Sequence, residues 1–404
     1  MAVGTSCGGI KWPSQQFGIK NANSAANYTF TCANMVSGVQ AVGMNANFDL
    51  QPVFQLTQSE IYELNEGLPQ IEMTVNRVLD GTCPTYLMAS VDAPNPTLFG
   101  RTPCKSILGL AIFPCTNDSA EGTPDAVLGV SGAQVSSIGY NFTVDGPFTE
   151  DVTFVANNML WNSGSMVNHP GYVGQTLNPA ALADAATLSF SGCNAGNNGA
   201  PQGNTGVAFR EDLKFTFDGS LGVDQNGAVA DPDATILPPD VYGIKSSGVN
   251  KDQIPIQSIS VSVDLNREEI NILGKRGPNT RTITLPVQVN TNIDVTSDTD
   301  HLVSAIENGI LMPSGTGSCL TARNLINRTI RIATCEGLRV YTGIRNKLLS
   351  VSRSGGDTGG GNVTITYSFQ TYNTFVVMHE NDINPSATGV AGWWANRSNH
   401  LVTL

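Results

Sequence analysis

Charged side chains are scarce in this chain. Asp, Glu, Lys and Arg make up 13% of the 404 residues, against about a quarter in a typical soluble domain. We therefore expect neighbouring subunits to cover much of the surface. The 21 Lys and Arg residues are spread along the chain, and 33 Asp and Glu residues give a net charge of −12. Binding to nucleic acid through counterion release needs several basic side chains on one face, so the sequence shows no DNA-binding footprint.

Closely spaced cysteines and long apolar runs are missing as well. Zinc and redox sites need close spacing, so neither is indicated. We expect mostly reduced, buried thiols in a protein that folds in a cytoplasm, although Cys104 and Cys115 could face each other across a hairpin. The sequence shows no signal peptide, and no run approaches the roughly eighteen apolar residues that cross a bilayer. The eight cysteines stand at positions 7, 32, 83, 104, 115, 193, 319 and 335.

Motifs for catalysis are absent too. Asp300-His301 is most simply part of a helix start, and His379-Glu380 with Asp382 is more typical of a solvated turn than of a metal site. The glycine-rich stretch 352–362 has strand pattern on both sides and no following lysine, so it does not predict a phosphate cradle. Neither a Gly-x-Ser-x-Gly elbow nor a His-Glu-x-x-His motif occurs. The sequence predicts no enzyme, no cofactor and no metal.

Glycine, by contrast, is abundant, with 42 residues, and Asn, Thr and Ser are plentiful. This composition predicts an all-β protein with many turns. The length allows two or three domains. We expect strands at 71–78, 281–289 and 213–217, together with the hairpins 135–155 and 347–369. Short flanking helices are predicted at 57–67, from a capping box at Thr57–Glu60, at 266–273 and at 298–307.

The two halves of the chain look like one module written twice. Polar-alternating strand patterns recur in the same order and at nearly equal spacing, which favours a symmetric assembly over a lone active site. The pairs are Val39–Val42 with Ile256–Ile259, Asp49-Leu50 with Asp264-Leu265, Ile71–Asn76 with Leu285–Asn290, and Leu79-Asp80 with Ile293-Asp294. The predicted divisions are an N-terminal arm (1–26), a first module (27–161), a connecting β-rich segment (162–250), a second module (251–380) and a C-terminal tail (381–404).

These strand patterns resemble a tail tube protein of a tailed bacteriophage. The resemblance leaves 162–250 and both ends unexplained. The segments that carry it are Ile256–Ile270, Leu273-Gly274, Arg281–Val289, Glu60–Gly67, Pro69–Gly81, and the hairpins Tyr140–Val155 and Lys347–Phe369 with the tip Gly355–Asn362.

The resemblance implies β-sandwich or barrel modules whose inner sheets join into a multi-subunit barrel. Rings of six modules would stack into the hollow tail tube of a virion that is assembled in the cytoplasm of the host bacterium, and the DNA genome would pass through it during ejection. Two modules per chain then predict a trimeric pseudo-hexamer, with a hexamer of chains that use one module each as the alternative. The implied partners are further copies of the chain, the tape-measure protein, the tail terminator and tip proteins, and a sheath if the tail contracts.

Two groups of residues follow as candidates for function. The first comprises alternate polar residues of the inner strands, which would face the lumen. It consists of Glu72, Thr74, Asn76, Gln288 and Asn290. The second would form contacts between rings or subunits. It consists of Asp145, Gly146, Pro147, Arg353, Asp357, Trp393 and Trp394.

Two other classes of protein stay open. One is another structural part of a virion, such as a capsid decoration, neck or baseplate protein built on the same module. The other is a carbohydrate-binding or adhesive β-protein, which predicts clustered Trp and Tyr in one module. The pair Trp393-Trp394 hints at the latter, but it could equally fill the core of its own module.

Overall fold

The computed structural model confirms an all-β fold. In the part of the chain that the structure describes, the helices are single turns, α1 (Thr85–Ala89), α2 (Leu98–Arg101), η1 (Trp12–Ser14) and η4 (Arg210–Asp212). The structure describes residues 10, 12–21, 29–30, 34–57, 59–113, 124, 126–156, 158–163, 189–190, 206–218, 256–273, 280–296, 329–334, 337–356 and 362–379.

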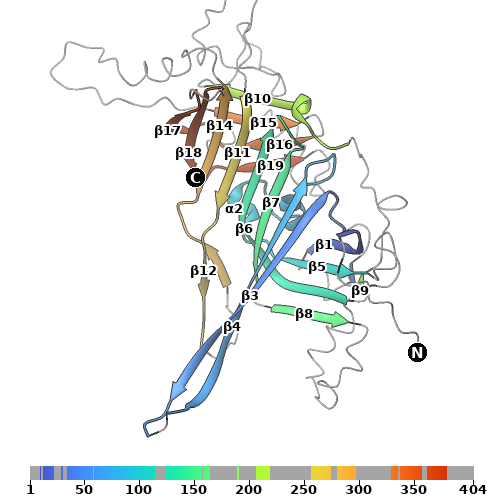
Figure 1. Cartoon of the computed structure of the whole chain (residues 1–404), viewed down its shortest axis with the longest axis vertical. Helices are drawn as coiled ribbons and strands as arrows, with labels where there is room; N and C mark the ends of the chain where they lie inside the picture. The colour runs from blue at the N-terminus through green and yellow to red at the C-terminus, as the bar shows by residue number, and fades with distance from the viewer. Residues whose placement is uncertain are drawn as a thin grey trace, which may run out of the picture.

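The main sheet is a path of eight antiparallel strands in the order β17-β18-β14-β11-β6-β7-β4-β3 (Figure 1). Strands from the two halves of the chain therefore lie in one continuous sheet. The strands are β3 (Val39–Phe54), β4 (Ile61–Val78), β6 (Ala126–Thr143), β7 (Thr149–Ala156), β11 (Ile256–Asp264), β14 (Gln288–Thr296), β17 (Lys347–Ser354) and β18 (Thr364–Tyr372).

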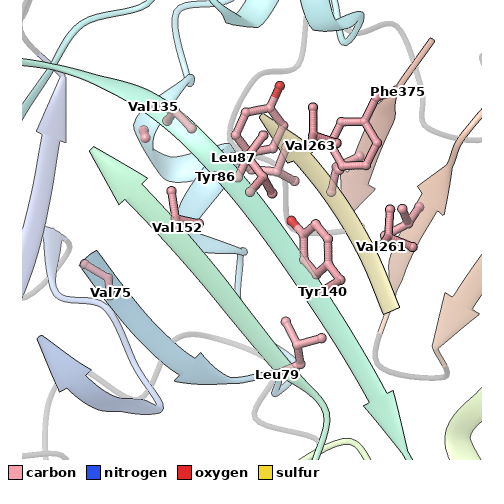
Figure 2. Packing of buried hydrophobic residues seen from close by; sticks show 14 of the residues in the cluster. Val75, Leu79, Tyr86, Leu87, Val135, Tyr140, Val152, Val261, Val263 and Phe375 are labelled. Atoms are coloured by element: carbon pink, nitrogen blue, oxygen red, sulfur yellow. The ribbon is translucent and has the colours of Figure 1, made fainter. Parts of the chain in front are cut away.

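The main sheet has one apolar face, because successive side chains of a strand point to opposite sides. This face forms the hydrophobic core, to which Val75, Val152, Tyr140 and Val261 contribute from the successive strands β4, β7, β6 and β11 (Figure 2). Each is at most 1% exposed. Burying such a side chain contributes about 1.5–3 kcal/mol, so this face provides most of the drive to form the sheet.

Smaller elements cover the apolar face. Tyr86 and Leu87 of α1 and Phe375 pack onto it (Figure 2). A four-stranded sheet contributes Ile330, Ile332 and Val340 to the same core. That sheet consists of β10 (Leu213–Asp218), β15 (Thr329–Thr334), β16 (Leu338–Tyr341) and β19 (Val376–His379), in this order.

Strand β6 belongs to two sheet regions. Its first part pairs with β5 (Ser106–Ile112) and β8 (Asn158–Ser163), and its second part pairs with β7 and β11. Gly132 lies at the register shift near the end of the first part, with φ of +64°, a backbone angle that favours glycine. β1 (Gln15–Asn21) pairs with β5. Two further pairs are β2 (Thr29–Phe30) with β9 (Ser189–Phe190), and β12 (Arg267–Ile270) with β13 (Thr280–Ile283).

A buried pair of opposite charges lies across β4 and β7. Arg77 and Glu150 are register partners, and both are 0% exposed. The Arg77 guanidinium donates to Asp80 Oδ1 at 2.8 Å, to Cys83 O at 2.8 Å and to Thr82 Oγ1 at 2.7 Å. These bonds hold the segment that leads from β4 to α1.

The Glu150 carboxylate completes this connection. It accepts hydrogen bonds from the backbone N–H of Thr85 at 2.6 Å, the N–H of Tyr86 at 3.2 Å and the Tyr140 hydroxyl at 2.8 Å. Burial and the nearby Glu150 carboxylate raise the pKa of Tyr140 well above its ordinary value. The hydroxyl therefore stays protonated and remains a donor.

Two predicted helices are wrong. Residues 57 and 59–67 belong to the turn and second strand of the β3–β4 hairpin, in which Phe54 pairs with Ile61. Thr57 has φ of +86°, which no right-handed helix allows. Residues 267–270 form β12, and Asn266 before it has φ of +38°. The short apolar spacing in both segments fits a strand as well as a helix, and pairing with a partner strand decides between them.

Most predicted strands are confirmed. Residues 71–78 lie within β4, residues 213–217 within β10, and the hairpins 135–155 and 347–369 are β6–β7 and β17–β18. The strand predicted at 281–289 is interrupted between β13 and β14, where Pro286 has no N–H to donate to a partner.

Other predictions concern the chain's outer parts. The predicted N-terminal arm contains a core strand, since Phe17 and Ile19 of β1 are 2% and 3% exposed. The predicted helix at 298–307 and most of the segment 162–250 lie outside the described residues.

The Glu150 network leads to a stability prediction. Glu150→Gln keeps the side-chain shape but replaces a carboxylate oxygen with an amide donor that faces other donors. We expect the free energy of unfolding to fall by about 1–3 kcal/mol. Denaturant unfolding followed by fluorescence measures it. Glu72→Gln, on an exposed position of β4, is the matched control and should stay within about 0.5 kcal/mol of the native chain. Equal loss in both variants would contradict the role given to Glu150.

Candidate functional site: a polar sheet face and two open edges

The second face of the main sheet is mostly polar, although Val78 of β4 and Val155 of β7 also lie on it. Its side chains are small and uncharged for the most part, and they are exposed or half-buried. By register they form rows that cross the sheet. Its polar members are Asn45, Glu72, Thr74, Asn76, Asp151, Thr153, Ser137, Asn141, Thr143, Ser258, Ser260, Ser262, Asp264, Gln288, Asn290, Asn292, Asp294, Thr366, Ser368, Gln370, Lys347, Ser350 and Ser352.

Side chains on this polar face bond to one another across the strands. Asn76 Nδ2 donates to Asp151 Oδ1 at 2.6 Å. Asp294 accepts from Ser258 Oγ at 2.5 Å and from Thr366 Oγ1 at 2.6 Å, so neighbours on both sides hold its carboxylate. The face thus meets much of its hydrogen-bonding need internally, which leaves less to offer a passing ligand.

The polar face carries an excess of negative charge. Its carboxylates are Glu72, Asp151, Asp264 and Asp294, and among its described residues Lys347 is the single cation. A surface of this kind repels phosphate groups rather than binding them.

The five predicted lumen residues all lie on this face. Glu72, Thr74 and Asn76 alternate with buried residues along β4, and Gln288 and Asn290 do so along β14. They are not neighbours, because β7, β6 and β11 separate the two strands.

Sequence reasoning missed much of the polar face. The alternation Ser258-Ile-Ser-Val-Ser-Val263 signals one polar and one apolar face, and it could have identified the serines of β11. The predicted repeat instead pairs Asp294 with Asp80. In the structure Asp80 accepts a hydrogen bond from Arg77 on the core side, whereas Asp294 lies on the polar face.

Two strands end the main sheet without a described partner on their outer side, β3 at one end and β17 at the other. Residues 39–48 of β3 include neither proline nor a charged residue. Met44 is 39% exposed on this edge, and Val351 of β17 is 41% exposed on the other. A long edge without charge or proline, such as this part of β3, readily pairs with another chain.

Two four-stranded units make up this sheet, and they have the same internal order. β3-β4-β7-β6 is followed by β11-β14-β18-β17. Register shifts occur at corresponding places, between Val39 and Ala41 in β3 and between Ile256 and Ser258 in β11. A second pair lies between Val135 and Ser137 in β6 and between Leu348 and Ser350 in β17.

This register corrects part of the repeat read from sequence. The match of Val39–Val42 with Ile256–Ile259 agrees with the shared bulge. Other predicted matches are shifted along the chain. When the strand pairing is followed across each unit, Val75 of β4 corresponds to Ile293 of β14, not to Val289. Short alternating runs look alike when they slip by an even number of residues, since the side-chain period is two.

The two units are joined by pairing between β6 and β11, which we call the internal seam. Thr143 lies opposite Ser258, Ser262 opposite Gly139, and Asp264 opposite Ser137. The last strand of one unit thus pairs with the first strand of the next. At the two ends of the sheet, β3 is the first strand of its unit, like β11, and β17 is the last strand of its unit, like β6.

The predicted contact residues are scattered. Asp145, Gly146 and Pro147 form the turn between β6 and β7, and Arg353 is exposed on the free edge β17. Asp357, Trp393 and Trp394 lie outside the described residues.

The structure describes some of the residues in the metal and cysteine predictions and not others. His379 is 0% exposed in β19, while Glu380 and Asp382 lie outside the described part of the chain. Cys83 and Cys104 form no disulfide, and Cys115 lies outside the description. Within the described ranges no group of three or more His, Cys, Asp or Glu could hold a metal ion. No helix in those ranges is long and apolar enough to cross a membrane.

Comparison with known proteins gives similarity only to solved structures. No protein-family model and no curated protein matches the chain. It is similar to a chain of the sheath–tube complex of an extracellular contractile injection system (PVC, extended state), with 12% identity, 38% of this chain and 92% of that chain covered, and a TM-score of 0.28. It is similar to the tube-terminating cap of the anti-feeding prophage, with 13% identity, 40% and 99% coverage, and a TM-score of 0.27. It is also similar to a chain of the sheath/tube terminator of the PVC system in the extended state. The identity is 13%, the match covers 38% of this chain and 97% of that chain, and the TM-score is 0.29.

Proposed function

We propose that this chain is a structural protein of a tail tube, in which three copies close a ring and rings stack around a channel. The observation that carries the proposal is the internal seam. The seam pairs the last strand of one unit with the first strand of the other. The sheet of a single chain therefore ends in a first strand, β3, on one side and a last strand, β17, on the other. Repeating the same seam between copies removes both edges, as closed barrels do.

The size of the ring follows from strand number. Three copies of the eight-stranded path would form a barrel of 24 strands. With strands about 4.8 Å apart and tilted by about 40°, such a barrel measures about 50 Å across between backbones. Barrels of 16–18 strands already leave an aqueous channel, so this ring would be open. Six whole chains, each contributing both units, would double the strand number.

The polar face would line the channel. The apolar face is covered by α1 and the four-stranded sheet of the same chain, so these layers fit on the outside of a closed ring. The excess of carboxylates and the mutual hydrogen bonds of the polar side chains then suit a wall along which DNA slides without binding.

The proposal also implies partners. Open tubes need proteins that set their length and close their ends, which here would be a tape-measure protein and tail terminator and tip proteins. A sheath would be added if the tail contracts. The turn 145–147 is a candidate for contacts between rings, because it is the exposed end of the β6–β7 hairpin.

The seam between copies can be tested by cross-linking. Ser262 opposes Gly139 at the internal seam, and the corresponding residues at the free edges are Asn45 and Ser352. We expect Asn45→Cys with Ser352→Cys to form disulfides between copies upon oxidation. Non-reducing electrophoresis should show a ladder that stops at three chains.

The matched control is Asn45→Cys with Val351→Cys, because Val351 points to the other face of the sheet. It should not cross-link, and neither should the native cysteines of the unmodified chain. A ladder that stops at six would replace the trimer with a hexamer of whole chains. If the double-cysteine variant forms rings in electron microscopy but gives no ladder in electrophoresis, this seam is rejected.

The lining can be tested by adding positive charge. Glu72→Lys with Gln288→Lys would place six lysines in a trimeric ring. We expect assembled tubes of this variant to retain linear duplex DNA in co-sedimentation, less so as salt rises, and virions carrying it to eject DNA poorly. Glu72→Gln with Gln288 unchanged is the control and should not retain DNA. Normal ejection by the lysine variant would count against a channel lined by this face.

Electron microscopy of the purified chain separates this function from its rivals. Stacked hollow rings with three-fold symmetry support the tube. Isolated rings that never stack favour a neck, baseplate or decoration protein. Persistent monomers at high concentration would leave the tube without support and would favour an adhesive β-protein.

A further inference from the structure

The β3–β4 hairpin extends beyond the main sheet as a long arm, which we define as residues 48–70 (Figure 1). Its surface is apolar to an unusual degree for an exposed hairpin. Many exposed apolar side chains on one element indicate an interaction site. Exposed fractions are 57% for Phe48, 49% for Leu50, 39% for Val53, 65% for Phe54, 90% for Leu56, 53% for Ile61, 62% for Tyr62 and 48% for Leu64.

The second unit has a shorter arm in the corresponding place. It consists of β12 and β13, which lie between β11 and β14 as the long arm lies between the body parts of β3 and β4. This short arm rests on the first unit. Arg267 donates to the carbonyls of Val135 and Thr102, the latter at 2.7 Å, and Arg281 donates to the carbonyl of Val155 at 3.0 Å.

The short arm therefore shows where an arm lies relative to a seam. Across the internal seam, the arm of the later unit reaches back onto β6 and β7 of the earlier unit. Arg281 also forms an ion pair with Glu269 within the arm, at 2.8 Å. Burial, with a smaller contribution from Arg281, lowers the pKa of Arg267 to about 10, so its guanidinium remains charged near neutral pH.

We infer that the β3–β4 arm docks on the second unit of the adjacent copy in the ring, beside the seam between copies. The inference rests on the proposed ring. If the seam between copies repeats the internal one, the long arm reaches back onto β17 and β18 of the neighbour. The register shifts in β6 and β17 show which positions of the two units correspond. Val135 corresponds to Leu348 and Ser136 to Leu349, and from there the pairing makes Val155 of β7 correspond to Gln370 of β18.

The expected landing place on the second unit is also apolar. Leu349, in the bulge of β17, is 62% exposed, whereas its counterpart Ser136 is polar. Tyr372 at the end of β18 is 50% exposed, and Leu285 just before β14 is 55% exposed. Register places the ends of β14 and β18 together, since Gln288 pairs with Tyr372. An apolar arm thus meets an apolar surface.

The two seams would then differ in chemistry. Arginine side chains bound to carbonyl oxygens fasten the internal seam, and apolar contact fastens the seam between copies. Placing the long apolar arm over the internal landing place would leave the polar groups there without partners, which disfavours that arrangement. Around each ring, short arms at the internal seams would then alternate with long arms at the seams between copies.

The test uses charge at the arm and at its landing place in the full-length chain. We expect Leu50→Lys and Leu349→Glu each to raise the concentration for half-maximal ring assembly at least tenfold, as measured by sedimentation velocity. The double variant should recover most of the loss, because the two new charges would attract each other. Ile270→Lys is the matched control, since Ile270 is an exposed apolar residue (43%) on the short arm, and it should assemble normally.

The outcomes separate this inference from the proposed function. Native chains that form rings while Leu50→Lys and Leu349→Glu also assemble normally would overturn the docking and keep the ring. Rings of Leu50→Lys that form normally but no longer stack would overturn it too, because the arm would then contact the next ring. Failure of the native chain to form rings would reject the proposed function itself, and the docking with it.

Discussion

Unpaired backbone groups at the ends of a sheet are the constraint on which the rest of this structure depends. Every strand inside the eight-stranded path has both sides hydrogen-bonded, whereas β3 and β17 each have one side without a partner among the described strands. Residues 39–48 of β3 carry none of the charges or prolines that commonly protect an edge. An arrangement in which each edge meets the other kind on a second copy removes this exposure at both ends.

The alternation of side chains turns the same sheet into two surfaces with separate roles. Valine, isoleucine and aromatic residues on one side form the core with α1 and the four-stranded sheet. Serine, threonine and asparagine on the other side bond to each other and to a few carboxylates. One period-two pattern thus supports both stability and the proposed passage of DNA.

Buried polar contacts fix how the covering elements sit on the apolar face. Arg77 holds the segment before α1, and Glu150 binds the first backbone N–H groups of α1 together with the Tyr140 hydroxyl. Leaving either charge unpaired in the core would be costly. The arms use a related principle at the internal seam, where Arg267 and Arg281 bind carbonyl oxygens of the other unit.

The sequence by itself determined the all-β class, most body strands, the two hairpins and the polar positions of β4 and β14, because composition and alternation are local properties of the chain. Tertiary structure alone decided that 57–67 and 266–273 are hairpin arms rather than helices, that Asp80 and Asp294 lie on opposite sides, and which strands meet at the seam. The physical reason is that pairing is set by neighbours distant in sequence, and a period of two cannot distinguish registers that differ by an even number of residues.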